Sequence, residues 1–142
     1  MDFEPVKFLI VDDDEVSIMK IKRAIKKANL GNPVFVAMDG IEALEMLRGD
    51  AGQERITQPY IVTLDINMPR MDGHEFLKEI REDPNLHNVV VFVLTTSNSE
   101  ADIQAAYEKN VAGYILKENS EYSLIEKINM LERFSNLVVL PK

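Results

Sequence analysis

The chain has 142 residues, of which 46% are hydrophobic, and this composition predicts one globular domain with a sizeable core. Its formal net charge of -8 argues against sequence-independent binding to nucleic acid, which depends on lysine and arginine to neutralise phosphates. The sequence has no cysteine, which excludes disulfides and thiolate chemistry, and no apolar stretch reaches the roughly 18 residues of a membrane span. We therefore expect a cytoplasmic domain that contacts neither nucleic acid nor membrane.

Apolar runs and helical spacings alternate along the chain. The run VVVFVLT at 89–95 is continuous, which is typical of a strand buried on both faces of a sheet. Between Glu15 and Asn29, apolar residues instead recur at helical spacing after Asp14, a candidate N-cap. In chain order the predicted elements are strand 7–12, helix 15–29, strand 34–38, helix 39–48, strand 60–65, helix 73–83, strand 89–95, helix 100–110, strand 113–117 and helix 121–134.

Five strands that alternate with five helices predict an α/β fold, with a doubly wound parallel sheet and helices on both of its faces. We interpret residues 1–142 as a single domain with a core at about 7–134. A polar, exposed loop is expected at 49–59, and an apolar, extended tail within 135–142.

Polar side chains gather where the predicted strands end. They are Asp12, Asp13 and Asp14 after the first strand, Asp65 after the third, Thr95 and Thr96 at the fourth, and Lys117 at the fifth. Because ligands of open parallel sheets bind beyond the carboxyl ends of the strands, we expect these groups to form one site.

The chemistry of this predicted site follows from its charges. Several carboxylates held together repel one another, so that either one takes a proton or a cation binds among them. Oxygen ligands without sulfur suit a hard ion such as Mg²⁺. Lys117 and a strand-end hydroxyl add positive charge and a donor for phosphoryl oxygens. Together these groups indicate phosphoryl transfer, with Asp65 as the nucleophile that forms an aspartyl phosphate.

Four motifs occur in an order and at a spacing that resemble the receiver domain of two-component response regulators. They are LIVDDD, LDINMPRMDG, VLTTS and YILK, and the resemblance extends from about residue 7 to residue 134. The resemblance implies the flavodoxin-like (βα)5 fold with strand order 2-1-3-4-5. It also implies a protein that catalyses its own phosphorylation and dephosphorylation rather than a conventional turnover enzyme.

The resemblance assigns a role to each matching residue. Asp65 becomes the phosphoacceptor, Lys117 the phosphate-binding lysine, Thr95 the switch hydroxyl and Tyr114 the aromatic switch residue. The Mg²⁺ ligands become Asp13, Asp65 and the backbone carbonyl of Asn67, with Asp12 acting mainly through a metal-bound water. The signal is then expected to emerge on the face formed by helix 100–110, strand 113–117 and helix 121–134.

Two residues depart from the usual receiver pattern. Receivers commonly have a proline in a cis peptide after the lysine, but here Glu118 follows Lys117, and we expect that peptide to be trans. Receivers also often have a very small residue after the switch hydroxyl. Thr96 occupies that position here and is expected to narrow access to the acyl phosphate.

Partners follow from the resemblance alone. The loop at 49–59, the segment VLTTSNSEADI and the tail FSNLVVLP resemble stand-alone receivers associated with phytochrome-type histidine kinases. The expected phosphodonor is a histidine kinase or a phosphotransfer protein, and the expected output is an unidentified protein target. No DNA-binding segment follows residue 142, so direct DNA-binding output is not expected, and the apolar tail favours homodimerisation or partner docking.

Other interpretations remain open for the site. Asp14 also fits a simple helix cap, Tyr114 also fits ordinary sheet packing, and the lone residues His74 and His87 fit the surface. A metal-dependent phosphohydrolase is the rival enzyme class, although its acids usually lie two residues apart on the first strand under a cap insertion. A receiver-like scaffold without phosphorylation is the third class, but it would be expected to lack one of the site residues.

Overall fold

The computed structural model describes residues 5–27, 31–117 and 121–141. Within these ranges the predicted alternation of strands and helices is confirmed, with most boundaries within two residues of the prediction. The elements are β1 (Lys7–Val11), α1 (Glu15–Lys27), β2 (Val34–Ala37), α2 (Gly40–Arg48), β3 (Tyr60–Leu64), α3 (Gly73–Glu82), β4 (Val90–Thr95), α4 (Glu100–Glu108), β5 (Gly113–Leu116) and α5 (Glu121–Leu137). The peptide between Lys117 and Glu118 lies outside the described residues, so the predicted trans geometry stays a prediction.

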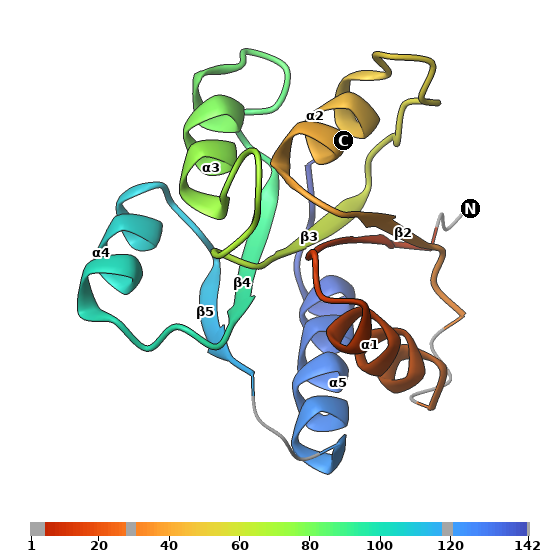
Figure 1. Cartoon of the computed structure of the whole chain (residues 1–142). Coiled ribbons are helices and arrows are strands. Elements are labelled where there is room, and N and C mark those ends of the chain that lie inside the picture. Colours follow the sequence, from red (N-terminus) through yellow and green to blue (C-terminus); the bar gives the residue numbers. More distant parts are fainter. Residues whose placement is uncertain (1–4, 28–30, 118–120, 142) are drawn as a thin grey trace.

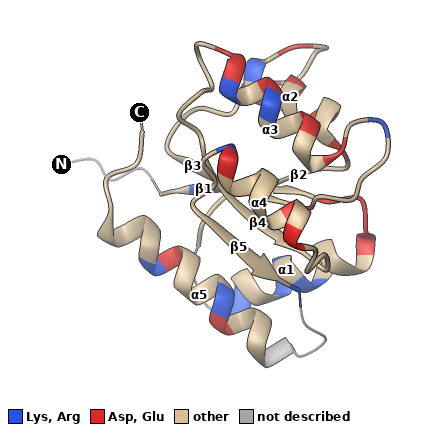
Figure 2. Cartoon of the chain, turned by 90° about the vertical axis from the view of Figure 1, so that its left-hand side faces the viewer, with Lys and Arg blue, Asp and Glu red and all other residues tan. Residues whose placement is uncertain are grey.

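The five strands form one parallel sheet in the order β2-β1-β3-β4-β5, as predicted. Helices α1 and α5 cover one face of the sheet, and α2, α3 and α4 lie toward the other (Figure 1). The only charged residue in any of the strands is Lys7, at the start of β1. Figure 2 accordingly shows the acidic and basic residues mainly on helices and loops. A sheet this apolar requires cover on both faces, and the helices supply it.

Two apolar clusters fill the spaces between the sheet and its helices. Neighbouring strand residues point to opposite faces, so Leu9 and Val11 join one cluster while Phe8 and Ile10 join the other. The first cluster continues into α2 and α3 through Leu47 and Leu77, among other residues. The second is closed by buried residues of α1 and α5, namely Ile18, Ile21, Ala24, Ile25, Leu124, Ile128 and Leu131.

Side-chain caps fix where four of the helices begin, and in α4 the Ser99 hydroxyl accepts from the Asp102 amide. Asp14 accepts a hydrogen bond from the Val16 amide at 3.0 Å, which confirms it as the cap of α1. Asp39 caps α2. Asp72 caps α3 in a reciprocal capping box, in which Asp72 accepts from the Glu75 amide and the Glu75 carboxylate accepts from the Asp72 amide.

The C-terminal helix is longer than predicted. The predicted helix 121–134 in fact continues to Leu137, so its predicted end was three residues too early, and the segment 137–142 that was expected to be extended is helical at its first residue. Ser135 donates to the Glu132 carbonyl, and its side chain therefore satisfies the helix backbone instead of ending the helix. After the helix the chain stays packed on the domain, because Leu140 is buried in the cluster beneath α1 and α5.

Helix α4 is held in place differently from helices α1, α2 and α3. Of its residues only Ala106 is buried, so apolar packing contributes little to its position. Arg81 of α3 instead donates to the carbonyls of Lys109 and Asn110, just beyond the C-terminal end of α4. The described part of the chain contains no helix that is both long and apolar enough to cross a bilayer.

Candidate functional site

The carboxyl ends of β1 and β3 bring three acids together. The amide of Asp12 donates to the Ala37 carbonyl at 3.0 Å, and the amide of Asp65 donates to the Val11 carbonyl at 2.9 Å. These bonds continue the sheet by one residue and place both carboxylates at its edge. One carboxylate oxygen from each of Asp12, Asp13 and Asp65 lies within 4.8 Å of the other two.

The three acids differ in their exposure to water. Asp12 and Asp65 are buried, with 1% and 7% of their surface exposed, whereas Asp13 is exposed. Buried carboxylates require compensating charge, and an exposed third carboxylate leaves an open side through which a cation can enter. All three donors are carboxylate oxygens, which fit Mg²⁺ or a similar hard ion.

Lys117 supplies the compensating charge. Its backbone amide donates to the Thr95 carbonyl at 2.8 Å, and its Nζ donates to Asp12 at 2.7 Å and to Asp65 at 3.4 Å. Burial raises the pKa of Asp12, and the hydrogen bond from Lys117 offsets this only in part. Burial disfavours the ammonium, but the hydrogen bonds and charges of Asp12 and Asp65 together outweigh that effect and raise the pKa of Lys117. The ammonium is therefore retained between two buried acids.

The predicted switch residues occupy neighbouring strands. Thr95, at the end of β4, is fully buried, and Tyr114 is on β5. The Tyr114 ring packs against the apolar cluster beneath α2 and α3, and its hydroxyl donates to the Ser97 carbonyl at 2.8 Å. These contacts fit the sheet-packing interpretation of Tyr114, and its role as a switch residue stays a prediction.

The loop from Ile66 to Asp72, which contains the exposed Asn67, is held by neighbouring backbone. A side chain at Gly73 would lie 2.6 Å from the Asp65 carbonyl, so only glycine allows the start of α3 to approach β3 this closely. On the other side of the loop, Arg70 donates to the buried carboxylate of Asp39 at 2.6 Å. Burial opposes ionisation of Asp39, but the hydrogen bond and charge of Arg70 and the hydrogen bonds from the amides of Ile41 and Glu42 together outweigh it and lower the pKa of Asp39. Sequence reasoning missed this pair.

Two cavities adjoin different ends of the sheet. The smaller, of about 150 Å³, lies beside Lys117 and is also lined by Thr96 and by Lys20 of α1. The larger, of about 490 Å³, is lined by residues of α2, the loop 49–59 and the segment after α3. The larger cavity is lined by none of the predicted site residues, and the smaller one is lined by Lys117 and Thr96 but by none of the three clustered acids.

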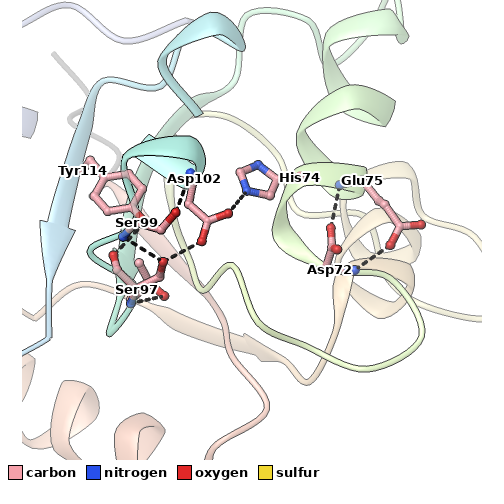
Figure 3. A network of polar contacts seen from close by, with 8 residues as sticks. Asp72, His74, Glu75, Ser97, Ser99, Asp102 and Tyr114 are labelled. Atoms are coloured by element: carbon pink, nitrogen blue, oxygen red, sulfur yellow. Dashed lines mark hydrogen bonds and ion pairs between the residues drawn. The ribbon is translucent and has the colours of Figure 1, made fainter. Parts of the chain in front are cut away.

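A further polar network, missed by the sequence analysis, lies beside the switch residues (Figure 3). His74 on α3 contacts Asp102 on α4 through Nε2 and Oδ1 at 2.9 Å, and the Ser97 hydroxyl donates to the other Asp102 oxygen. The assignment of His74 to the surface was therefore wrong, whereas His87 is exposed as predicted. A lone histidine carries no sequence signal for a partner 28 residues away.

The comparisons with known proteins agree on one family. The model of the response regulator receiver domain matches residues 8–129. Response regulator Rcp1 of Synechocystis sp. is 31% identical over 130 residues, which cover 92% of this chain and 88% of that protein. The probable methanogenesis regulatory protein FilR2 of Methanothrix harundinacea is 33% identical over 131 residues, covering 92% of this chain and 84% of the relative.

Solved structures give the same result. The phosphorylated cyanobacterial phytochrome response regulator RcpA superimposes with a TM-score of 0.89 at 32% identity, covering 98% of this chain and 100% of the other. The Mn(2+)-bound form of response regulator Rcp1 has a TM-score of 0.86 at 30% identity, covering 97% of this chain and 100% of the other.

Proposed function

Because the chain belongs to the response regulator receiver domain family of two-component signalling proteins, we propose that it accepts a phosphoryl group on Asp65 in a Mg²⁺-dependent reaction. The observation that carries this proposal is the position of the Lys117 ammonium, which donates to both Asp12 and Asp65 at the edge of the sheet. A buried carboxylate beside a cation is a nucleophile whose phosphorylated form retains a counter-charge.

The donor is a phosphohistidine of a histidine kinase or of a phosphotransfer protein. An Asp65 carboxylate oxygen attacks phosphorus, the bond to the histidine nitrogen breaks, and that nitrogen leaves with the bonding electron pair. Lys117 binds a phosphoryl oxygen, and Thr95 donates its hydroxyl to another. Asp12, Asp13, Asp65 and the Asn67 carbonyl would hold Mg²⁺, with Asp12 acting mainly through a bound water, and the ion would neutralise charge on the transferring group.

The domain acts in the cytoplasm and changes its own surface instead of turning over substrate. The face formed by α4, β5 and α5 communicates the phosphorylated state to a protein target, because Lys117, which follows β5, contacts both Asp65 and the backbone of Thr95. The phosphorylated RcpA structure and the Mn(2+)-bound Rcp1 structure support this assignment, and the phytochrome response regulators among the similar structures suggest a phytochrome-type kinase as partner.

The metal requirement gives a direct test with Asp13. Asp13 is exposed, so Asp13→Ala is expected to leave the fold intact and to weaken Mg²⁺ binding at least about tenfold, because one of few charged ligands is lost. At limiting Mg²⁺, labelling by a phosphorylated histidine kinase should fall in proportion to the loss of Mg²⁺ affinity. At high Mg²⁺ it should recover. Isothermal titration and labelling assays measure both effects.

Asp14→Ala is the matched control, since it removes the neighbouring acid that caps α1. It should lower the melting temperature slightly and leave Mg²⁺ affinity unchanged. Labelling that persists in excess chelator, or equal Mg²⁺ affinity in Asp13→Ala and the wild type, would contradict the proposal. Turnover of small phosphate esters would instead favour the phosphohydrolase class.

We also propose a homodimer that uses the C-terminal residues. Leu137 is 83% exposed and Val139 is 94% exposed, and apolar side chains exposed to this degree commonly mark an interface. The double variant Leu137→Ser, Val139→Ser is expected to shift a dimer to a monomer in light scattering, with and without beryllofluoride. It retains Leu140, which the core requires. A wild-type chain that is monomeric in both conditions would contradict the proposal.

A further inference from the structure

A polar bridge joins the beginnings of α3 and α4. His74 Nε2 lies 2.9 Å from Asp102 Oδ1, and both side chains are 29% exposed (Figure 3). Hydrogen bonds from Ser97 and His74 lower the pKa of Asp102, so this carboxylate is ionised and accepts hydrogen bonds only. Nε2 of His74 therefore carries the donated proton, while Nδ1 is buried without a hydrogen-bond partner among the described residues.

Ser97 connects this bridge to both predicted switch residues. Its hydroxyl donates to Asp102 Oδ2 at 2.5 Å, and its carbonyl accepts the Tyr114 hydroxyl at 2.8 Å. Its amide also points to the Thr95 hydroxyl oxygen, at a longer 3.4 Å. Ser97 is thus held by His74 of α3 through Asp102. Its carbonyl accepts the hydrogen bond that orients Tyr114.

The other hydrogen bonds of this part of the chain are local, since the Ser99 amide donates to the Ser97 hydroxyl and the Ser99 hydroxyl accepts from the Asp102 amide, each at 3.4 Å. Ala106 is the one buried residue of α4, and the Arg81 contacts act near the opposite end of that helix. The position of Ser97 therefore depends on hydrogen bonds more than on apolar packing. Loss of the contact from α3 leaves Asp102 with the Ser97 hydroxyl and a larger exposure to water.

We propose that His74 and Asp102 are positioning residues that hold Ser97 so that Tyr114 is ordered in its inward position, with its ring against the apolar cluster and its hydroxyl on the Ser97 carbonyl. The consequence for phosphorylation depends on the function proposed above. If the phosphorylated state requires an inward tyrosine, a chain that has already ordered it binds a phosphoryl group more tightly. The order of Tyr114 itself does not depend on that function.

The reach of the side chain at position 74 provides matched variants. Glutamine can place its amide nitrogen near the position of the histidine Nε2, so His74→Gln retains a donor to Asp102. The asparagine of His74→Asn carries the same amide on a shorter side chain, which does not reach Asp102. His74→Ala removes the donor altogether, although alanine favours a helix more than histidine does. An effect shared by alanine and asparagine but absent from glutamine identifies the hydrogen bond itself.

The first experiment follows Tyr114 in protein labelled with fluorotyrosine, without Mg²⁺ or phosphodonor. Its fluorine resonance is assigned with Tyr114→Phe. In His74→Ala and His74→Asn the resonance is expected to move toward that of an exposed tyrosine, while His74→Gln stays near the wild type. Ser97→Ala removes the hydrogen bond from the Ser97 hydroxyl to Asp102 and should cause the same shift of the Tyr114 resonance. This variant tests the inference even if a variant at position 74 folds poorly. His87→Ala, at the exposed histidine, should change nothing.

The second experiment measures the affinity for beryllofluoride with Mg²⁺. Loss of one hydrogen bond to a partly exposed carboxylate is expected to weaken that affinity about 3- to 10-fold in the alanine and asparagine variants. An unchanged Tyr114 resonance in His74→Ala, or a glutamine variant that behaves like alanine, overturns the inference. If the wild type binds no beryllofluoride, the proposed function fails, and the fluorine resonances still decide whether His74 orders Tyr114.

Discussion

Asp65→Asn is expected to abolish phosphorylation while preserving the fold. Asparagine has nearly the same shape, but its amide is a far weaker nucleophile than a carboxylate and cannot form the acyl phosphate. Incubation with a radiolabelled kinase or with acetyl phosphate, followed by mass measurement, should give no stable adduct, a loss of at least about 10³-fold in rate.

The stability of this variant separates chemistry from folding. Asp65 lies beside the buried Asp12, and its charge is one of the causes that raise the pKa of Asp12. Removing that charge relieves repulsion between two buried acids, so the melting temperature should stay the same or rise. Labelling of Asp65→Asn at the wild-type rate, or on a neighbouring acid with wild-type kinetics, would show that Asp65 is not the phosphoacceptor.

Lys117→Met is expected to reduce both stability and phosphorylation. The substitution removes the ammonium from between two buried carboxylates, which leaves Asp12 without its charged partner. Loss of one partner from a buried ion pair costs about 3–5 kcal/mol in the free energy of unfolding. Phosphorylation should fall at least about 10²-fold, because the transferring group loses a positive contact.

The pH dependence of this loss has a definite sign. Burial already raises the pKa of Asp12, and without Lys117 only the hydrogen bond from the Asp14 amide is left to oppose it. An acid with a raised pKa in the folded state takes up a proton on folding, so its protonation stabilises the fold at low pH. That contribution is lost as the pH rises through the folded-state pKa. Lys117→Met should therefore regain stability relative to the wild type when the pH is lowered from about 8 to about 5.

Chemical denaturation at several pH values measures this effect. Lys20→Met is the matched control, because Lys20 is an exposed lysine that lines the same cavity as Lys117. It should change the free energy of unfolding by less than about 0.5 kcal/mol at every pH. If Lys117→Met is as stable as the wild type at pH 8, Lys117 does not compensate the buried acids.

The order of the elements could be predicted because each strand is an apolar run and each helix has its own spacing. The end of α5 could not be predicted, because serine and asparagine are frequent in turns, whereas Ser135 and Asn136 here form hydrogen bonds to Glu132 within the helix. A polar residue near a helix end is ambiguous until its side-chain orientation is known. The tail was therefore predicted to begin too early.

The convergence of Asp12, Asp65 and Lys117 followed from topology alone, because parallel strands end at one edge of their sheet. The contact between His74 and Asp102 could not be predicted in this way, since it depends on how two helices lie beside each other. The pairing of Arg70 with Asp39 has the same origin, as it joins a loop to the cap of α2. Sequence patterns place residues on elements, but contacts between elements depend on packing.

The sparse burial of α4 has a consequence for how this protein can diverge. A helix with a single buried residue, Ala106, imposes few steric requirements on its own sequence. Its position depends largely on contacts to backbone carbonyls at one end and to Asp102 at the other, so most of its outward residues can be exchanged without a loss of stability. The outward surface of α4 can therefore change in shape and charge while the acidic cluster at the sheet edge is retained.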